Sequence, residues 1–161
     1  MKKILSFLLI SAGTFYMIYL QFVASVNPND AVERSIQKGK IDAQDIVVTH
    51  LEDDYAYTLF YNEDSYGFAK TEEFALGWRV VDVVDGLPFD QSLANEGYLF
   101  DKAIGMVHGL VDSVVEKVNV GEEGSNITHI PGQDVRVWYN VGVSQEDTEQ
   151  VKYVGENDIE F

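Results

Sequence analysis

The sequence predicts a mainly β fold of the α+β class, preceded by an apolar N-terminal segment. Three observations support this class. About nine short segments are rich in β-branched and aromatic residues, turn residues separate them, and strands and helices do not alternate regularly. Parallel sheets need helical crossovers, so the pattern favours an antiparallel β-sandwich or a partly open barrel of about nine short strands.

The stretch Ile4 to Val26 contains 23 residues without a charge and follows Lys2 and Lys3. As a helix it would be about 34 Å long, enough to cross a hydrocarbon core of about 30 Å. This length favours a retained single-pass anchor, with the membrane as its partner and the rest of the chain outside the cell. The alternative is a signal peptide cleaved near Ser25, which would leave a secreted protein.

We therefore expect three parts: a signal anchor or signal peptide over 1–26, a short helix and linker over 27–40, and an acidic extracytoplasmic β domain over 41–161. The helix is predicted over 29–38. Pro28 restricts its entry, Asn29 or Asp30 can cap it, and Gly39 is placed to end it.

The β domain is predicted strand by strand from its alternation and its turn residues. The expected strands cover 46–51, 55–61, 66–70, 76–84, 104–111, 114–120, 127–130, 134–143, 150–154 and 159–161, with an ordered loop over 85–101. Within 114–120, we expect Val114, Glu116, Val118 and Val120 to share a face. Within 134–143, the strict alternation places Val135, Val137, Tyr139 and Val141 on the core side.

Composition excludes several classes of function. The chain carries 27 acidic and 11 basic residues, a formal net charge of −16, and such a field repels nucleic acid and anionic lipid. We therefore expect no nucleic-acid partner. The chain also contains no cysteine, which excludes disulfides, thiolate metal sites and cysteine nucleophiles.

The order of these features carries a resemblance. Ala31 to Ile36, Ile46 to His50, Phe60-Tyr61, Gly67-Phe68-Ala69 and Gly77-Trp78-Arg79 follow one another after the basic N-terminus and the apolar segment. In this order the chain resembles small, uncharacterised exported or membrane-anchored proteins of low-GC Gram-positive bacteria. The resemblance implies a location and a two-part β domain, and it carries over no functional residues.

The sequence contains no motif that indicates a particular reaction, so we predict no catalytic residues and no cofactor. His50, His108 and His129 lack metal-binding spacing and are expected on strands or strand ends. The segment Asn62 to Glu73 matches an EF-hand loop only in part, and both of its flanks are predicted strands. A better cation candidate is the acidic patch Glu52, Asp53 and Asp54, whose alternative is a solvated acidic turn.

Tyr55, Tyr57 and Tyr61 occupy alternate positions of one predicted strand. If Ala56, Thr58 and Phe60 face the core, these tyrosines form an exposed aromatic row suited to sugars or a protein partner. The alternative is that another layer covers this face as well.

The function that this pattern favours is a non-catalytic extracytoplasmic binding module on a membrane tether, with an envelope protein or a glycan as its partner. One alternative is a cell-wall glycan hydrolase that uses a carboxylate pair, because 27 acids leave room for such a pair. The other is a calcium-ordered adhesive domain that uses the acidic patch.

Overall fold

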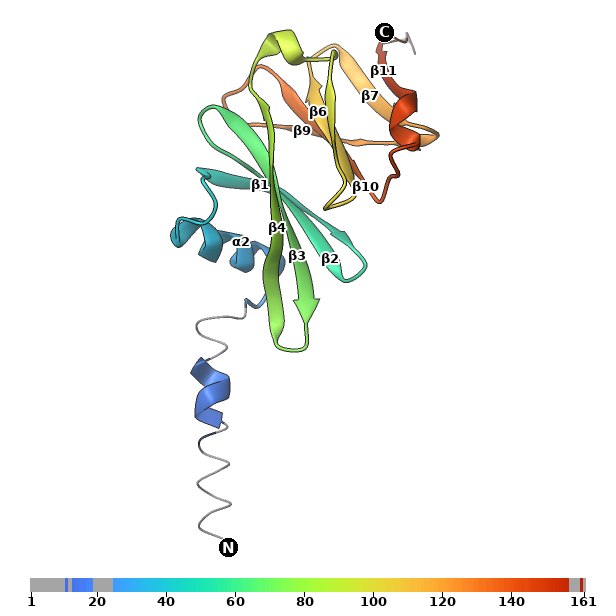
Figure 1. The fold of residues 1–161 in the computed structure, drawn as a ribbon. Coiled ribbons are helices and arrows are strands. Elements are labelled where there is room, and N and C mark those ends of the chain that lie inside the picture. Colours follow the sequence, from blue (N-terminus) through green and yellow to red (C-terminus); the bar gives the residue numbers. More distant parts are fainter. Residues whose placement is uncertain (1–10, 12, 19–24, 157–159, 161) are drawn as a thin grey trace, which may run out of the picture.

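The computed structural model describes residues 11, 13–18, 25–156 and 160, and it confirms the predicted mainly β, antiparallel class (Figure 1). The helix α2 covers Pro28–Gln37. The strands are β1 (Asp45–Glu52), β2 (Tyr55–Tyr61), β3 (Ser65–Phe74), β4 (Gly77–Pro88), β5 (Tyr98–Asp101), β6 (Met106–Val111), β7 (Val115–Val120), β8 (Glu123–Gly124), β9 (Asn126–His129), β10 (Arg136–Val141) and β11 (Val151–Gly155). Two 3₁₀ turns cover Gln91–Leu93 and Asp147–Gln150.

The strands form three antiparallel sheets. Sheet A is a meander with the order β1-β2-β3-β4, sheet B has the order β5-β6-β10-β9, and sheet C has the order β11-β7-β8. Sheet A is the predicted meander of the N-terminal half. Its first hairpin turns at Asp53 and Asp54, and Asp53 adopts a φ of 52° that lets Glu52 pair with Tyr55.

Three hydrophobic clusters show how the layers meet. The largest cluster lies between sheets A and B and joins Leu59 and Phe68 to Leu110 and Tyr139. A second cluster lies between sheets B and C, where Trp138 is fully buried. Sheet B therefore lies between two cores, which explains why every residue of β6 is buried and why both faces of β10 are covered.

The third cluster joins α2 to the other face of sheet A. Val32 of α2 is fully buried and packs with Phe60 and Ala69. Asn27 caps the helix, since its side-chain oxygen accepts a hydrogen bond from the Asp30 amide at 2.9 Å, and Gly39 ends it at a φ of 66°. The predicted helix is confirmed, and both of its ends lie one residue earlier than expected.

Several strand predictions needed correction. The segment 85–101 is not a loop throughout, because β4 continues to Pro88 and β5 pairs with β6 from Tyr98. The described residues contain eleven strands where about nine were expected. For the segment 114–120 the expected face holds at Val118 and Val120, which are buried, and is wrong at Val114 and Glu116, which are exposed. The β7–β11 register shifts between Val154 and Gly155, and this irregularity places Val115 in the core instead. Most of 159–161 lies outside the described residues, and Glu160 forms a single bridge with Val154.

The predicted membrane anchor is also corrected. Within the residues that the structure describes, no helix combines the length and the apolar character needed to cross a membrane. This finding contradicts the predicted single-pass location. Much of the stretch Ile4 to Val26 lies outside the described residues, and the part that is described includes a helical piece over 13–18. Ser25, next to the proposed cleavage point, is 3% exposed and pairs with Trp78.

Candidate functional site

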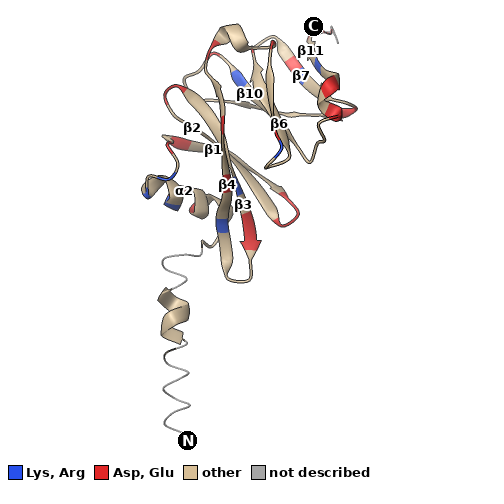
Figure 2. Cartoon of the chain, viewed as in Figure 1, with Lys and Arg blue, Asp and Glu red and all other residues tan. Residues whose placement is uncertain are grey.

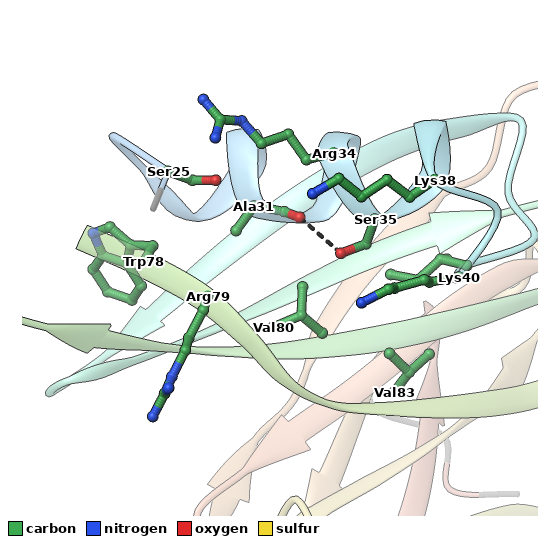
Figure 3. A pocket seen from close by; sticks show the side chains of 11 residues that line it. Ser25, Ala31, Arg34, Ser35, Lys38, Lys40, Trp78, Arg79, Val80 and Val83 are labelled. Carbon is green, nitrogen blue, oxygen red and sulfur yellow. Dashed lines mark hydrogen bonds between the residues drawn. The ribbon is translucent and has the colours of Figure 1, made fainter. Parts of the chain in front are cut away.

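The candidate site is a groove between α2 and the adjacent part of β4, with a volume of about 420 Å³. Figure 3 shows α2 along one side and β4 along the other. The lining residues are Ser25, Ala31, Arg34, Ser35, Lys38, Lys40, Ile41, Trp78, Arg79, Val80 and Val83. We call this cavity the α2–β4 groove.

Positive charge gathers in the α2–β4 groove. Among the described residues, its lining includes four bases and no Asp or Glu, although the chain has 27 acids and only 11 bases. Three of these bases come from a short segment, since Arg34 and Lys38 lie one helical turn apart and Lys40 follows the end of the helix. Figure 2 shows these blue residues on α2 and just after it, while red residues mark several of the hairpin tips of the sheets. The groove is therefore a local basic site on an acidic protein.

The fourth base plays a different part. The Arg79 guanidinium lies over the Phe74 ring, 3.4 Å from the ring centroid, and its side chain points away from α2 (Figure 3). This stacking is a cation–π contact on the outer face of β4. Trp78 and Val80, the neighbours of Arg79 in the strand, line the groove on the α2 side.

The walls of the groove are held by buried contacts. Ala31 is 5% exposed and Ile41 is 4% exposed, and Ser35 donates a hydrogen bond to the Ala31 carbonyl at 3.0 Å. At one end, Ser25 and Trp78 exchange two backbone hydrogen bonds of 3.2 and 2.9 Å. The chain before α2 is thereby fixed to the edge of β4, and the groove begins beside this pair.

The structure also contains a buried polar pair that the sequence did not reveal. The Tyr66 hydroxyl and His108 Nδ1 lie 2.9 Å apart in a hydrogen bond between sheets A and B, and both side chains are 1% exposed. Burial lowers the pKa of His108 to about 4, a shift that the charge of Asp101 opposes, and burial also raises the pKa of Tyr66. Because water does not reach this pair, it is part of the core and not of the groove.

The predicted cation patch does not form a metal cluster. Glu52, Asp53 and Asp54 are exposed at the β1–β2 turn, and Glu52 lies 3.2 Å from the His50 ring nitrogen. Among the residues that the structure describes, no group of three or more histidine or acidic side chains could hold a metal ion. The EF-hand match is a β2–β3 hairpin, as expected.

The predicted tyrosine row is not exposed as a whole. Tyr57 is 6% exposed, and Tyr55 and Tyr61 are half-buried against the cluster between sheets A and B. Lys70 lies over this row, with its ammonium 4.1 Å from the Tyr55 ring centroid. Ala56, Thr58 and Phe60 on the opposite face are buried too, so β2 is covered on both sides, as the alternative had it.

The histidines lie where the sequence predicted them, on β1, β6 and at the end of β9. Among the described residues, two carboxylates have pKa values below the ordinary value. Hydrogen bonds from the Ser92 side chain and amide lower the pKa of Asp90, and those of Ser144 lower the pKa of Asp147. These shifts are opposite to the raised pKa that a glycosidase needs in its general acid.

Sequence reasoning missed the α2–β4 groove. The available signal was the run of three bases between Arg34 and Lys40 in a chain poor in bases. Only the fold shows that this run faces the edge of a strand more than 35 residues later in the chain. Comparison of the chain with protein-family models, with curated proteins and with solved structures found no match.

Proposed function

We propose that this protein is a non-catalytic binding module, and that its ligand carries negative charge and occupies the α2–β4 groove. The observation that supports this proposal is the charge of the groove. Three of the chain's 11 bases, Arg34, Lys38 and Lys40, line it on the α2 side, and its described lining residues include no acid, in a protein with a net charge of −16. On an acidic domain, a polar surface is expected to be lined with carboxylates. The positive charge of this groove therefore favours an anionic ligand.

The groove also combines charge with apolar surface. Trp78, Val80 and Val83 lie on the β4 side, opposite Lys38 and Lys40 on the helix side (Figure 3). Binding sites for specific ligands are concave, largely apolar and carry a few placed polar groups. This combination supports selective binding more than general attraction of counterions.

The scaffold that we propose for this site is a β-sandwich. Support comes from the cluster that packs sheet A against sheet B, and from the edge positions of β1 and β4 in sheet A. In such a scaffold α2 covers the outer face of sheet A, and the groove lies where the helix meets the β4 edge.

The test uses the full chain and two anionic probes, citrate and a hexapeptide rich in glutamate, followed by calorimetry and by backbone amide chemical shifts. We expect shifts to concentrate at 31–41 and 78–83. The double charge reversal Lys38→Glu with Lys40→Glu should weaken binding about tenfold, because each reversal changes a surface interaction of up to about 1 kcal/mol.

The matched control is the reversal of Lys102 and Lys117, which changes the net charge equally and lies outside the groove lining. It should leave the affinity within about twofold, since surface charges beyond a Debye length are largely screened. The proposal fails if neither probe binds, or if the control pair weakens binding as much as the groove pair.

A further inference from the structure

We infer that the interface between sheets A and B is an acid-sensitive hinge, which opens when the buried side chain of His108 takes up a proton, while the two halves of the molecule stay folded. This inference does not depend on the α2–β4 groove. It depends on the order of the elements along the chain, on the cores of the two halves, and on the polar pair between them.

From residue 25 to residue 156, the chain divides into two halves that are each continuous in sequence (Figure 1). The N-terminal half, 25–88, contains α2 and sheet A, and the C-terminal half, 98–155, contains sheets B and C. In this part of the chain no sheet combines strands of both halves. The halves are therefore joined by the connection 89–97 and by the packing of sheet A on sheet B.

Each half also has a core of its own. The α2 cluster around Val32 lies within the N-terminal half, and the cluster around Val118 and Trp138 lies within the C-terminal half. The cluster between sheets A and B, in contrast, combines residues of both halves. Opening at this interface would therefore leave one core intact in each half, as in the sub-global openings by which proteins lose part of their structure.

The connection is fixed at both of its ends. The Phe89 amide donates a hydrogen bond to the Asp64 carbonyl at 2.8 Å, in the N-terminal half. The Asn95 amide donates one to the Leu110 carbonyl at 3.0 Å, in the C-terminal half. Between these anchors lies the 3₁₀ turn Gln91–Leu93, none of whose residues is buried. A rotation of the halves would therefore turn about this short segment.

The trigger is the buried pair of Tyr66 and His108. The Tyr66 hydroxyl lies 2.9 Å from His108 Nδ1, across the interface, and both side chains are 1% exposed. A protonated imidazole here would have a neutral phenol as its partner, and burying a charge without a counter-ion is costly. The closed form therefore holds His108 neutral, and the open form, in which water reaches the ring, takes up a proton from solvent.

The surrounding groups do not compensate for this charge. On β5, the charge of Asp101 favours protonation of His108, but burial has the larger effect and lowers the pKa of His108 to about 4. On β10, the register partner of His108 is Tyr139, which is 3% exposed and whose pKa burial raises. Lys70 of β3 and Asp82 of β4 pair with each other in sheet A and carry opposite charges, so together they supply no net counter-charge.

The size of the effect follows from two pKa values. In the open form His108 has the ordinary pKa of 6.5, and in the closed form its pKa is about 4. The open form therefore binds the proton more tightly. Lowering the pH from 7 to 4 should increase the ratio of open to closed molecules about a hundredfold.

The experiment measures how often each core becomes accessible in the full chain. The chain contains no cysteine, so Val137→Cys, Val118→Cys and Val32→Cys each place a single thiol in the A–B interface, the C-terminal core or the α2 core. These three valines are 0% exposed, which makes the variants a matched set. A pyridyl disulfide, which also reacts with thiols in acid, labels each variant at several pH values from 7 to 4. Glutathione serves to correct for the intrinsic rate.

We expect the corrected labelling rate of Val137→Cys to rise about a hundredfold from pH 7 to pH 4, and the rates of the other two variants to rise far less. Adding His108→Gln to Val137→Cys should abolish the rise, because glutamine stays neutral. An equal rise in all three variants would mean global unfolding, and a constant rate for Val137→Cys would mean that the interface stays closed. Either result overturns the hinge.

A full rise that persists with His108→Gln would show that another group drives the opening, and would overturn the role of His108. Should this double variant unfold, the pH profile of Val137→Cys decides the result. A rise that begins near pH 6.5 supports histidine, whereas a rise that begins only near pH 4 is the profile of carboxylates and contradicts the proposal.

Discussion

At the scale of single residues, the buried His108 is a site where pH acts on stability. Burial lowers its pKa to about 4 from an ordinary value of 6.5, so the folded protein holds it neutral over a range in which the unfolded chain takes up a proton. The unfolded state therefore binds more protons between pH 6.5 and 4, and stability falls as the pH decreases through this window. The sequence predicted a strand position for His108, but not its partner Tyr66, which lies 42 residues away in the chain.

We therefore expect the free energy of unfolding to decrease by about 3 kcal/mol between pH 7 and pH 4 because of this one group. Urea unfolding at several pH values measures the change. His108→Gln should remove this part of the slope, whatever its effect at neutral pH. A variant that keeps the full slope would show that other groups produce the acid sensitivity.

Gly109 is the second residue whose role depends on packing. A methyl group added there would lie 2.7 Å from the Gly97 carbonyl oxygen and 2.7 Å from the Trp138 ring nitrogen. A backbone atom cannot move aside easily, so we expect Gly109→Ala to destabilise the protein by about 1–3 kcal/mol. Gly124→Ala is the matched control in another strand, where the nearest atom is 3.9 Å away. Thermal unfolding should separate the two variants, and equal melting temperatures would contradict this account.

At the scale of elements, α2 and the residues just after it position three of the groove's bases, so the capping residue of α2 can affect the site. Asn27→Ala removes the hydrogen bond to the Asp30 amide and should cost about 1 kcal/mol. Asn27→Asp keeps an acceptor and serves as the control. We expect the alanine variant alone to lower the melting temperature and to speed amide exchange at the start of α2. Unchanged exchange would mean that packing of Val32 on sheet A fixes the helix without the cap.

The same scale shows why some elements were predictable. Pro28 and Gly39 mark the start and the end of α2 through their local backbone preferences. The helix predicted from the sequence therefore agrees with the observed one to within one residue at each end. β5 was missed because Tyr98 to Asp101 is only four residues long and two of them are exposed. Its strand conformation depends on pairing with β6 and is not specified by local periodicity.

At the scale of the whole molecule, the net charge of −16 opposes compaction through repulsion among carboxylates. We expect sodium chloride to raise the melting temperature between about 0.02 and 0.5 M, because the Debye length falls below the spacing of many surface charges. Choline chloride should act equally, since screening does not depend on the cation. Calcium chloride at the same ionic strength is the contrasting case. A much larger stabilisation by calcium would favour an ordered cation at the acidic patch of Glu52, Asp53 and Asp54 and contradict simple screening.

The sequence by itself determined the mainly β antiparallel class, the position of α2 and most strands, because turn residues and alternation act over a few neighbouring positions. It also determined which side of β10 faces the largest core, since Val137, Tyr139 and Val141 alternate strictly. Tertiary structure alone decided that the opposite side, with Trp138, is buried as well. Alternation of apolar and polar residues identifies the strand face that packs on one core. It does not indicate whether a second sheet also covers the other face.

Tertiary structure also decided the candidate site. It buried Tyr57, left Glu52, Asp53 and Asp54 exposed at a turn, and brought Lys38 and Lys40 beside Val80. No spacing rule links residues 38–40 to residue 80, because their proximity results from docking α2 on sheet A next to an edge strand. The physical reason is that local preferences form the elements, while burial of apolar surface between distant elements determines which side chains share a groove.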